Sequence, residues 1–231
     1  YSFGESRLNS IIENRTDPIR VRLVQPNVKQ AEKWKPEYAE KFLIHHIELS
    51  KKSDLSNIDL VIWPETAVSY LVEDDNKLRR IISEELEVPV LLGARRLTEN
   101  KLFNSAFLLE KSGEIKNVYD KTNLVPFGEY IPFAKFLSKL GIFGLATDGI
   151  HGFSSGKARK VFGAEDFQAF LILICYEAIF PNMVDNLSPK VSWIVQITND
   201  AWFGEFSGPQ QHLTLARMRA VEQGLPLVRV A

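Results

Sequence analysis

Residues 170–177 have the sequence FLILICYE, in which a run of apolar and partly β-branched residues ends abruptly in a cysteine, an aromatic residue and a carboxylate. A run of this length predicts a buried strand. Catalytic groups in α/β sheets gather where strands end, so Cys175 is a candidate nucleophile. Taken alone, a cysteine beside leucine and isoleucine is more often a small hydrophobic residue of the core. Residues elsewhere in the chain decide between these alternatives.

The length and composition fit one large α/β domain. The chain has 231 residues, of which 45% are hydrophobic and 25% charged, and its net charge is -1. These values are ordinary for a globular protein and supply no electrostatic footprint for nucleic acid, so we expect no nucleic-acid partner. Cys175 is the only cysteine, so no internal disulfide can form. No apolar run reaches the roughly 18 residues of a membrane span.

Strands alternate with helices along most of the chain. We expect residues 1–18 to be a lead-in segment and residues 19–231 to form one domain. Residues 103–110 and 114–119 face each other across a short turn and predict a β-hairpin. The alternation predicts a mixed-sheet α/β layered fold. The other predicted strands are 19–24, 59–63, 88–92, 170–174, 191–198 and 227–230, and the predicted helices begin at Pro36, run through 78–82, and span 209–223.

Two more candidate residues follow predicted strands. Pro64 lacks a backbone donor and ends the strand at 59–63, which presents Glu65 just beyond the strand terminus. A carboxylate there is as often a solvated loop residue or a helix cap. Lys121 follows the second strand of the hairpin. Glu65, Lys121 and Cys175 are 56 and 54 residues apart, about the length after which a strand and helix return to the same sheet edge, so they could converge.

These three side chains suit covalent acyl transfer. A thiolate attacks a carbonyl, a carboxylate takes the proton, and an ammonium stabilises the oxyanion that forms. The lysine would lower the cysteine pKa from about 8.5, whereas the carboxylate opposes that shift but can accept the proton directly. The sequence has no glycine-rich phosphate loop and no Cys/His spacing typical of a metal site, so we expect no cofactor and no metal.

Residues 124–140 form an unusual apolar segment. LVPFGEYIP at 124–132 has three breakers and predicts a shaped loop, after which Pro132 opens a short helix with Phe133, Phe136, Leu137 and Leu140 on one face. That face either packs on the sheet, as most amphipathic helices do, or forms an apolar arm that meets lipid.

Several motifs in consistent order resemble those of the carbon-nitrogen hydrolase, or nitrilase, superfamily. They are WPE at 63–65, YDK at 119–121 and CYE at 175–177. Within that superfamily, LVPFGEYIP at 124–132, ICYE at 174–177, NDAWFG at 199–204 and QH at 211–212 resemble the apolipoprotein N-acyltransferase family. The resemblance covers residues 19–231. Motifs in register are more specific than any single residue and favour a nucleophilic Cys175 over a core cysteine.

The resemblance implies a role for each matching residue. Glu65 would be the general base, Lys121 the oxyanion donor and Cys175 the nucleophile, with the backbone amide of Tyr176 as a second donor. Glu129 would be the additional carboxylate of the superfamily, which holds Lys121 and helps to position the incoming group.

Four further positions would lie around the substrate or support the site. These are Glu177, Trp34, Asn104 and, at the start of the apolar arm, Phe127. The first three have simpler alternatives: Glu177 as a helix-start carboxylate, Trp34 as a loop anchor, and Asn104 as a polar residue at a strand edge.

The implied fold is a four-layer αββα sandwich attached to membrane helices, on the periplasmic face of the bacterial inner membrane. In the implied ping-pong reaction, Cys175 takes an acyl chain from the sn-1 ester of a phospholipid and holds it as a thioester. The α-amino group of the diacylglyceryl-cysteine of an apolipoprotein then takes the acyl group. Both substrates are lipids, which gives the arm from Phe127 to Leu145 a purpose.

The C-terminal part departs from the family pattern. The family has Gly-Arg-Pro where this chain has Gly224-Leu225-Pro226, so Leu225 puts any role of that arginine in doubt. The chain starts at Tyr1 without a methionine and stops at Ala231 within a predicted strand. We therefore expect a C-terminally truncated piece of a longer protein, from which the membrane helices are absent.

Three rival functions remain. A soluble nitrilase-like amidase, in which water cleaves the thioester, would use the same Glu, Lys and Cys but leaves the apolar arm and the NDAWFG and QH segments unexplained. A Cys-His protease-like site would pair His212 with Asp200, although His212 lies in a predicted helix behind the active edge. A non-enzymatic binding module would retain an inactive site.

Overall fold

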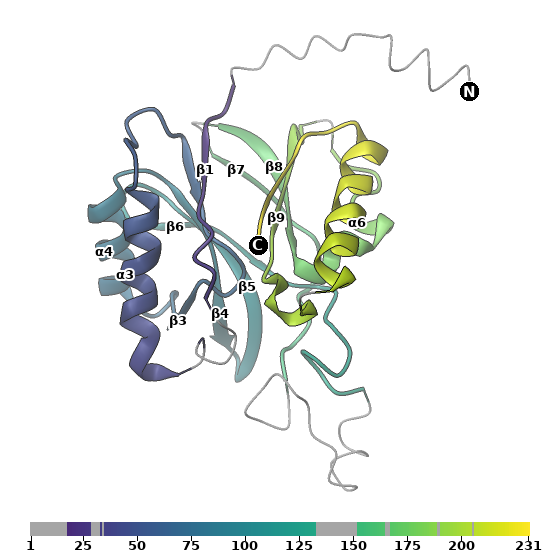
Figure 1. Cartoon of the computed structure of the whole chain (residues 1–231), viewed down its shortest axis with the longest axis horizontal. Helices are drawn as coiled ribbons and strands as arrows, with labels where there is room; N and C mark the ends of the chain where they lie inside the picture. The colour runs from purple at the N-terminus through teal and green to yellow at the C-terminus, as the bar shows by residue number, and fades with distance from the viewer. Residues whose placement is uncertain are drawn as a thin grey trace, which may run out of the picture.

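The computed structural model describes residues 18–28, 33, 35–132, 152–164, 167–188, 190–204 and 206–231. Within them, the strands form two sheets (Figure 1). The first has six strands in the order β1-β2-β4-β5-β6, with β3 paired to the second half of β4. β1, β2 and β4 are parallel, and β4, β5 and β6 are antiparallel. Their bounds are β1 Val21–Leu23, β2 Leu60–Ile62, β3 Val68–Leu71, β4 Val90–Thr98, β5 Lys101–Leu109 and β6 Ile115–Asp120.

The second sheet has four strands in the order β10-β9-β8-β7. β10, β9 and β8 are parallel, and β7 is antiparallel to β8. The bounds are β7 Val161–Ala164, β8 Phe167–Ile174, β9 Trp193–Ile197 and β10 Leu227–Val230. Short 3₁₀ helices follow two of these strands: η3 (Cys175–Ile179) and η4 (Pro181–Met183) come after β8, and η5 (Asp200–Phe203) comes after β9.

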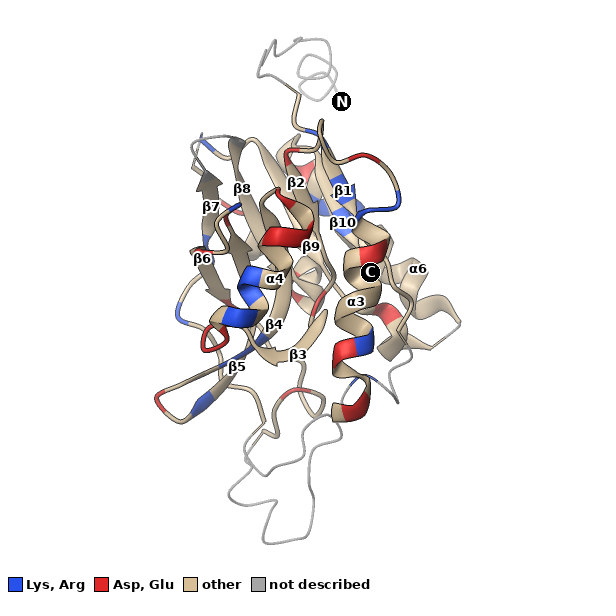
Figure 2. Cartoon of the chain, turned by 90° about the vertical axis from the view of Figure 1, so that its left-hand side faces the viewer, with Lys and Arg blue, Asp and Glu red and all other residues tan. Residues whose placement is uncertain are grey.

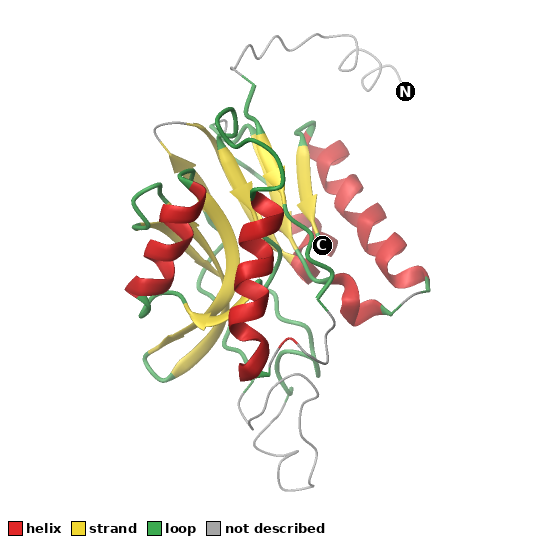
Figure 3. Ribbon diagram, turned by 60° about the vertical axis from the view of Figure 1, so that its left-hand side comes forward, coloured by secondary structure: helices red, strands yellow, loops and turns green. Residues whose placement is uncertain are grey.

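The two sheets pack face to face between helices, which gives four layers (Figures 1 and 3). α3 (Ala39–Ser50), which follows the 3₁₀ turn η1 (Pro36–Tyr38), and α4 (Asn76–Leu86) cover the outer face of the first sheet. α6 (Ser207–Gln223) covers the outer face of the second. The predicted αββα sandwich is therefore confirmed.

The apolar strands of the sequence are those covered on both faces. In β8, Ile172 and Ile174 pack toward the first sheet, whereas Leu171 and Leu173 pack in the cluster that includes Ala216 of α6. Every residue of β2 and of β9 is buried. Because successive side chains of a strand point to opposite faces, a strand with helices on one side and a sheet on the other is largely apolar, although β9 also carries the buried Gln196.

Three strand features differ from the prediction. β4 continues to Thr98 instead of ending at Leu92, and β3 and β7 were not expected. β4 pairs with β5 in an unbroken register from Val90 opposite Leu109 to Thr98 opposite Lys101. Ladder hydrogen bonds, which leave no side-chain pattern, therefore keep this arginine-containing segment extended. The helix predicted after Pro132, and residues 133–145 of the arm predicted from Phe127 to Leu145, lie outside the described residues.

The charged residues are mixed in sign where the structure describes them on the outer helices. α4 carries basic and acidic residues along its length (Figure 2), including an Arg80–Glu84 ion pair at 3.3 Å. Among the described residues, no helix combines the length and the apolar character needed to cross a membrane.

Candidate active site

One cavity of about 220 Å³ is lined by candidate residues that follow strands of both sheets. Glu65 comes directly after β2 and its proline, Lys121 after β6, and Cys175 after β8. Strand ends that are distant in sequence meet at this edge, as expected for an α/β fold. The cavity is also lined by Thr66, Asn104, Val125, Gly128, Glu129, Phe153, Trp202 and Phe203.

Glu65 sits in a tight turn that lies against β4. Thr66 has a left-handed φ of 47°. A Cβ atom on Gly93 would come within 2.5 Å of the Thr66 nitrogen and 2.7 Å of the Glu65 Cα, so only glycine permits this approach. On the backbone of Glu65 itself, the Lys33 ammonium donates a hydrogen bond to the carbonyl oxygen at 2.9 Å. The turn is thus fixed by β4 and by a buried lysine.

The carboxylate of Glu65 is held by donors from both sheets. Its Oε1 accepts hydrogen bonds from Asn104 Nδ2 at 2.7 Å and from Lys121 Nζ at 3.4 Å. Its Oε2 accepts one from the backbone N–H of Asn199 at 3.0 Å. Only 4% of Glu65 is exposed. The carboxylate is therefore buried and held in one orientation.

Lys121 lies between two carboxylates. Its Nζ donates to Glu129 Oε1 at 2.9 Å, and Asn104 Nδ2 donates to the same oxygen at 2.8 Å. Burial by itself would lower the pKa of Lys121, but the charges of Glu65, Cys175 and Glu129 outweigh it and raise the pKa above the ordinary value. Lys121 is therefore an ammonium that faces the cavity.

Cys175 occupies a strained position at the end of β8. Its φ is 49°, in the left-handed region that residues with a Cβ rarely adopt. Burial, and next the Glu65 charge, raise the pKa of its thiol to about 12, although the Lys121 charge and a hydrogen bond with Thr198 oppose the rise. The thiol thus stays protonated until a base removes its proton.

Glu177 is a buried link between the two sheets. Its Oε1 accepts hydrogen bonds from the Tyr119 hydroxyl at 2.6 Å and the Thr122 backbone N–H at 2.7 Å, and its Oε2 accepts one from Ile174 N–H at 2.8 Å. Burial raises the pKa of Glu177, and these hydrogen bonds oppose the rise. Glu177 is not among the described residues that line the cavity. The geometry favours a supporting role at the start of η3.

The other candidate residues fall into different surroundings. Tyr176 is half-buried, and its ring packs edge-on against Phe180 with centroids 5.1 Å apart. Asn104 is 2% exposed and bridges the two carboxylates described above. Phe127 has 55% of its surface exposed and a φ of 62°, in the loop that supplies part of the cavity wall. Trp34 lies outside the described residues.

His212 faces the main chain of Cys175. Its Nδ1 lies 3.0 Å from Asp200 Oδ1, and its Nε2 lies 2.9 Å from the carbonyl oxygen of Cys175. A Cys-His protease needs a ring nitrogen on the sulfur. The contact of Nε2 with the carbonyl oxygen leaves the protease-like alternative without geometric support.

Two contributors to the site were not assigned roles from the sequence. The backbone N–H of Asn199 holds Glu65, and the NDAWFG motif after a buried strand is the signal that marks this segment. The Lys33 contact with the Glu65 carbonyl has no such signal, because a buried lysine cannot be told from a surface lysine by its neighbours in sequence. Burial lowers the pKa of Lys33 to about 8, although the charges of Glu65 and Cys175 oppose the shift.

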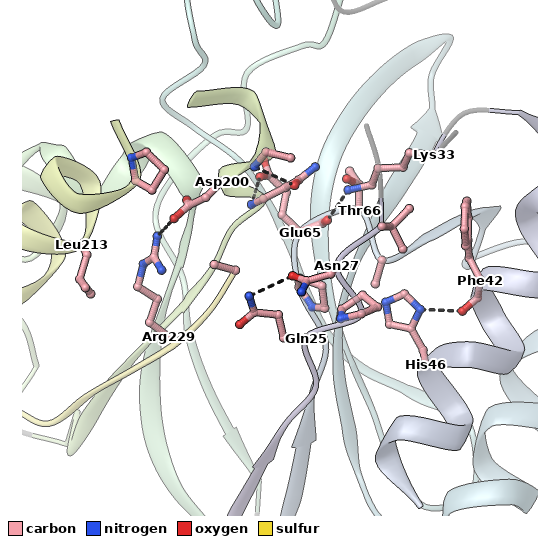
Figure 4. Close-up of a pocket in the computed structure, with 18 of the residues that line it drawn as sticks. Gln25, Asn27, Lys33, Phe42, His46, Glu65, Thr66, Asp200, Leu213 and Arg229 are labelled. Carbon is pink, nitrogen blue, oxygen red and sulfur yellow. Dashed lines mark hydrogen bonds and ion pairs between the residues drawn. The ribbon is translucent and has the colours of Figure 1, made fainter. Parts of the chain in front are cut away.

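A second hollow of about 600 Å³ adjoins the turn that carries Glu65 (Figure 4). Lys33 and His46 lie on one of its sides and Asp200 and Arg229 on the other, with Glu65 between them. Glu65 and Thr66 line both this hollow and the smaller cavity. Among the residues the structure describes, no group of three or more His, Cys, Asp or Glu side chains is placed to hold a metal ion.

The fold and the site together define a class of protein. Residues 20–231 match the family described as carbon-nitrogen hydrolase, and the chain belongs to that family. Solved structures with the same fold include a carbon-nitrogen hydrolase superfamily protein from Xanthomonas campestris, with a TM-score of 0.65 and 18% identity over 91% of this chain and 74% of that one. An amidase from Nesterenkonia sp. has a TM-score of 0.63 and 18% identity over 92% of this chain and 75% of that one.

Curated relatives of higher identity share one name, apolipoprotein N-acyltransferase. The protein from Brucella suis biovar 1 is 37% identical over 98% of this chain and 44% of its own length. Those from Rhodopseudomonas palustris and Allorhizobium ampelinum are 37% and 39% identical, each over 99% of this chain and 45% of its own length. The chain thus spans less than half the length of these relatives.

Proposed function

We propose that this chain is the catalytic domain of an apolipoprotein N-acyltransferase that moves an acyl chain from a phospholipid to the α-amino group of a diacylglyceryl-cysteine. The full-length protein would lie in the bacterial inner membrane, with this domain on the periplasmic face. The observation that carries the proposal is a buried thiol, Cys175, in one cavity with the Glu65 carboxylate and the Lys121 ammonium. The relatives of 37–39% identity support the choice of substrates.

In the first half-reaction, the thiol proton of Cys175 passes to the Glu65 carboxylate as the sulfur attacks the ester carbonyl carbon. The carbonyl oxygen becomes an oxyanion, which the Lys121 ammonium and the backbone N–H of Tyr176 stabilise. When this intermediate collapses, the bond to the glycerol oxygen breaks. That oxygen takes the proton from Glu65 and leaves as lysophospholipid, while the acyl chain stays on sulfur as a thioester.

In the second half-reaction, the amine of the acceptor attacks the thioester carbonyl and gives up a proton to Glu65. The same donors stabilise the second oxyanion, and its collapse breaks the carbon-sulfur bond. The sulfur regains a proton from Glu65, and the acceptor leaves as an amide.

Exposed aromatic side chains beside the cavity support a lipid substrate. Trp202 is 47% exposed and Phe203 38% exposed, and both line the cavity, while Phe127 is 55% exposed in the loop that forms its wall. Large exposed aromatic side chains grouped at an opening are typical of binding surfaces for apolar ligands.

The test is to incubate the full-length protein with phosphatidylethanolamine vesicles and to measure its intact mass. We expect one added acyl group on Cys175, released by hydroxylamine, and its loss on adding a diacylglyceryl peptide. Cys175→Ala is the control that cannot be acylated. An unmodified Cys175, with hydrolysis of simple amides instead, would establish the amidase alternative, and a Cys175 inert to both substrates would leave a binding module.

A further inference from the structure

Two buried side chains contact the carbonyl oxygen of Cys175. Gln196 of β9 donates to it from Nε2 at 3.1 Å, and His212 of α6 has its Nε2 at 2.9 Å. Gln196 is fully buried and His212 is 3% exposed. Neither is among the described residues that line the 220 Å³ cavity. They therefore act on the main chain of the nucleophile from behind.

The orientation of this peptide group decides where a neighbouring donor points. A trans peptide is planar, so the C=O of Cys175 and the N–H of Tyr176 point in opposite directions. The φ of 49° at Cys175 is costly for a residue with a Cβ and persists only where surrounding contacts impose it. Holding the oxygen toward Gln196 and His212 turns the N–H of Tyr176 away from them.

A charged pair fixes the ring of His212 in this role. Asp200 Oδ1 contacts Nδ1 at 3.0 Å, and Arg229 forms an ion pair with Asp200 Oδ2 (Figure 4). Burial would raise the pKa of Asp200, but hydrogen bonds from His212 and Arg229 lower it, so the carboxylate is charged. His212 thus contacts Asp200 through Nδ1, and it contacts both the Cys175 carbonyl oxygen and, at 3.0 Å, Gln196 Nε2 through its own Nε2, so both ring nitrogens are held in place.

We propose that His212 and Gln196 form a clamp on the Cys175 carbonyl that aims the Tyr176 N–H at the oxyanion. His212 is thus a positioning residue, backed by Asp200 and Arg229, and has no role as the base. The proposal rests on the acyl transfer proposed above. It also explains why an Asp-His pair resembling part of a protease triad stands behind a nucleophile whose base is Glu65.

The experiment compares two reactions of the same sulfur in the full-length protein. Acylation by phosphatidylethanolamine vesicles passes through an oxyanion, whereas alkylation by iodoacetamide needs the thiolate but forms no oxyanion. Two substitutions of His212 differ in reach. In His212→Gln, the side-chain Nε2 can take the place of the histidine Nε2, whereas the shorter side chain of His212→Asn reaches only toward Asp200. We expect His212→Asn to slow acylation by about 10- to 100-fold, less than complete loss of an oxyanion donor, and alkylation by less than about threefold.

Two variants and one control complete the design. His212→Gln should recover most of the acylation rate, and His45→Ala, which changes a histidine of α3, should leave both rates unchanged. Gln196→Met removes the other side chain of the clamp and leaves Asp200 in place. Like His212→Asn, it should slow acylation much more than alkylation. Gln196→Met therefore still tests the proposal if a His212 variant fails to fold.

Equal losses in acylation and alkylation would overturn the clamp, because His212 would then act on the thiol or on the fold. Equal rates for His212→Asn and His212→Gln would overturn it as well. If the wild type takes no acyl group from phospholipid, the proposed function fails, and p-nitrophenyl butyrate then supplies the oxyanion-forming reaction. A larger loss in the reaction with that ester than in alkylation would still support the clamp, and equal losses would refute it.

Discussion

The substitution Glu65→Gln separates proton transfer from packing, since glutamine has nearly the shape of glutamate. Burial and the Glu65 charge raise the pKa of Cys175 to about 12. At pH 7.5, a thiol with that pKa is ionised in only about one molecule in 30,000. A base that removes the proton during attack can therefore raise the acylation rate by up to about 10⁴-fold. We expect Glu65→Gln to slow acylation of Cys175 by about 10³- to 10⁴-fold at pH 7.5.

The same reasoning predicts how this loss depends on pH. Without its base, the variant relies on thiolate already present, so its rate rises about tenfold per pH unit until the thiol is ionised. The Glu65 charge raises the pKa of Cys175, so its removal lowers that pKa and brings the plateau to lower pH. The wild-type rate stays nearly constant from about pH 7 to 9, because the proton passes within the site. The deficit therefore shrinks as the pH rises.

The assay is single-turnover acylation of the full-length protein, followed by intact-mass measurement across this pH range. Glu129→Gln is the matched control, because it makes the same change in the other carboxylate that contacts Asn104 and Lys121. It should cause a smaller loss that does not vary with pH. A Glu65→Gln loss below about tenfold, or a deficit that is constant with pH, would refute the role of Glu65 as base.

Three further predictions concern the surroundings of the base. Lys121→Ala should slow acylation by at least about 100- to 1,000-fold, since it removes the proposed oxyanion donor and leaves two buried carboxylates without their cation; full activity in the same mass assay would contradict the proposed role. Gly93→Ala would place a Cβ 2.7 Å from the Glu65 Cα and should lower the stability by about 1 to 3 kcal/mol along with the acylation rate. Gly163→Ala, whose nearest neighbour would be 3.6 Å away, should leave the melting temperature and rate unchanged. Lys33 has its pKa lowered from 10.5 to about 8 in the folded chain, so the unfolded chain binds more protons between these values. Stability should therefore rise with pH across that window by about 3 kcal/mol in the wild type relative to Lys33→Met, and a melting-temperature difference that falls with pH would contradict this.

The sequence predicted elements whose side-chain pattern reflects burial on both faces. Residues 170–174 of β8 and the segment before Glu65 are continuous apolar runs, β9 is apolar apart from Gln196, and such runs occur where a strand has layers on both sides. β3, with four residues, and the second half of β4 follow no such pattern, because pairing with neighbouring strands keeps them extended. Strands held mainly by ladder bonds are therefore the part of this fold that local pattern does not predict.

The candidate site was predictable as a set of residues but not as a network. The ends of three strands marked Glu65, Lys121 and Cys175, which the structure brings to one cavity. Asn104 donates to two carboxylates at once, and this depends on the register between strands. No local sequence motif predicts that register. The contact of His212 with the Cys175 carbonyl depends likewise on how α6 packs over the second sheet.

The site exists only where the two sheets meet. Glu65 follows β2 of the first sheet, and its carboxylate accepts a hydrogen bond from the backbone N–H of Asn199, which follows β9 of the second, at 3.0 Å. Glu177 of η3, which follows β8 of the second sheet, accepts a hydrogen bond from the hydroxyl of Tyr119 in β6 of the first at 2.6 Å. These buried bonds tie the two sheets together beside the site at hydrogen-bond distance, and proton transfer from Cys175 to Glu65 requires a comparably short distance. Packing between the sheets therefore sets the distance from the Glu65 carboxylate to the sulfur of Cys175, and a cavity-forming substitution in that core should slow acylation as well as lower stability.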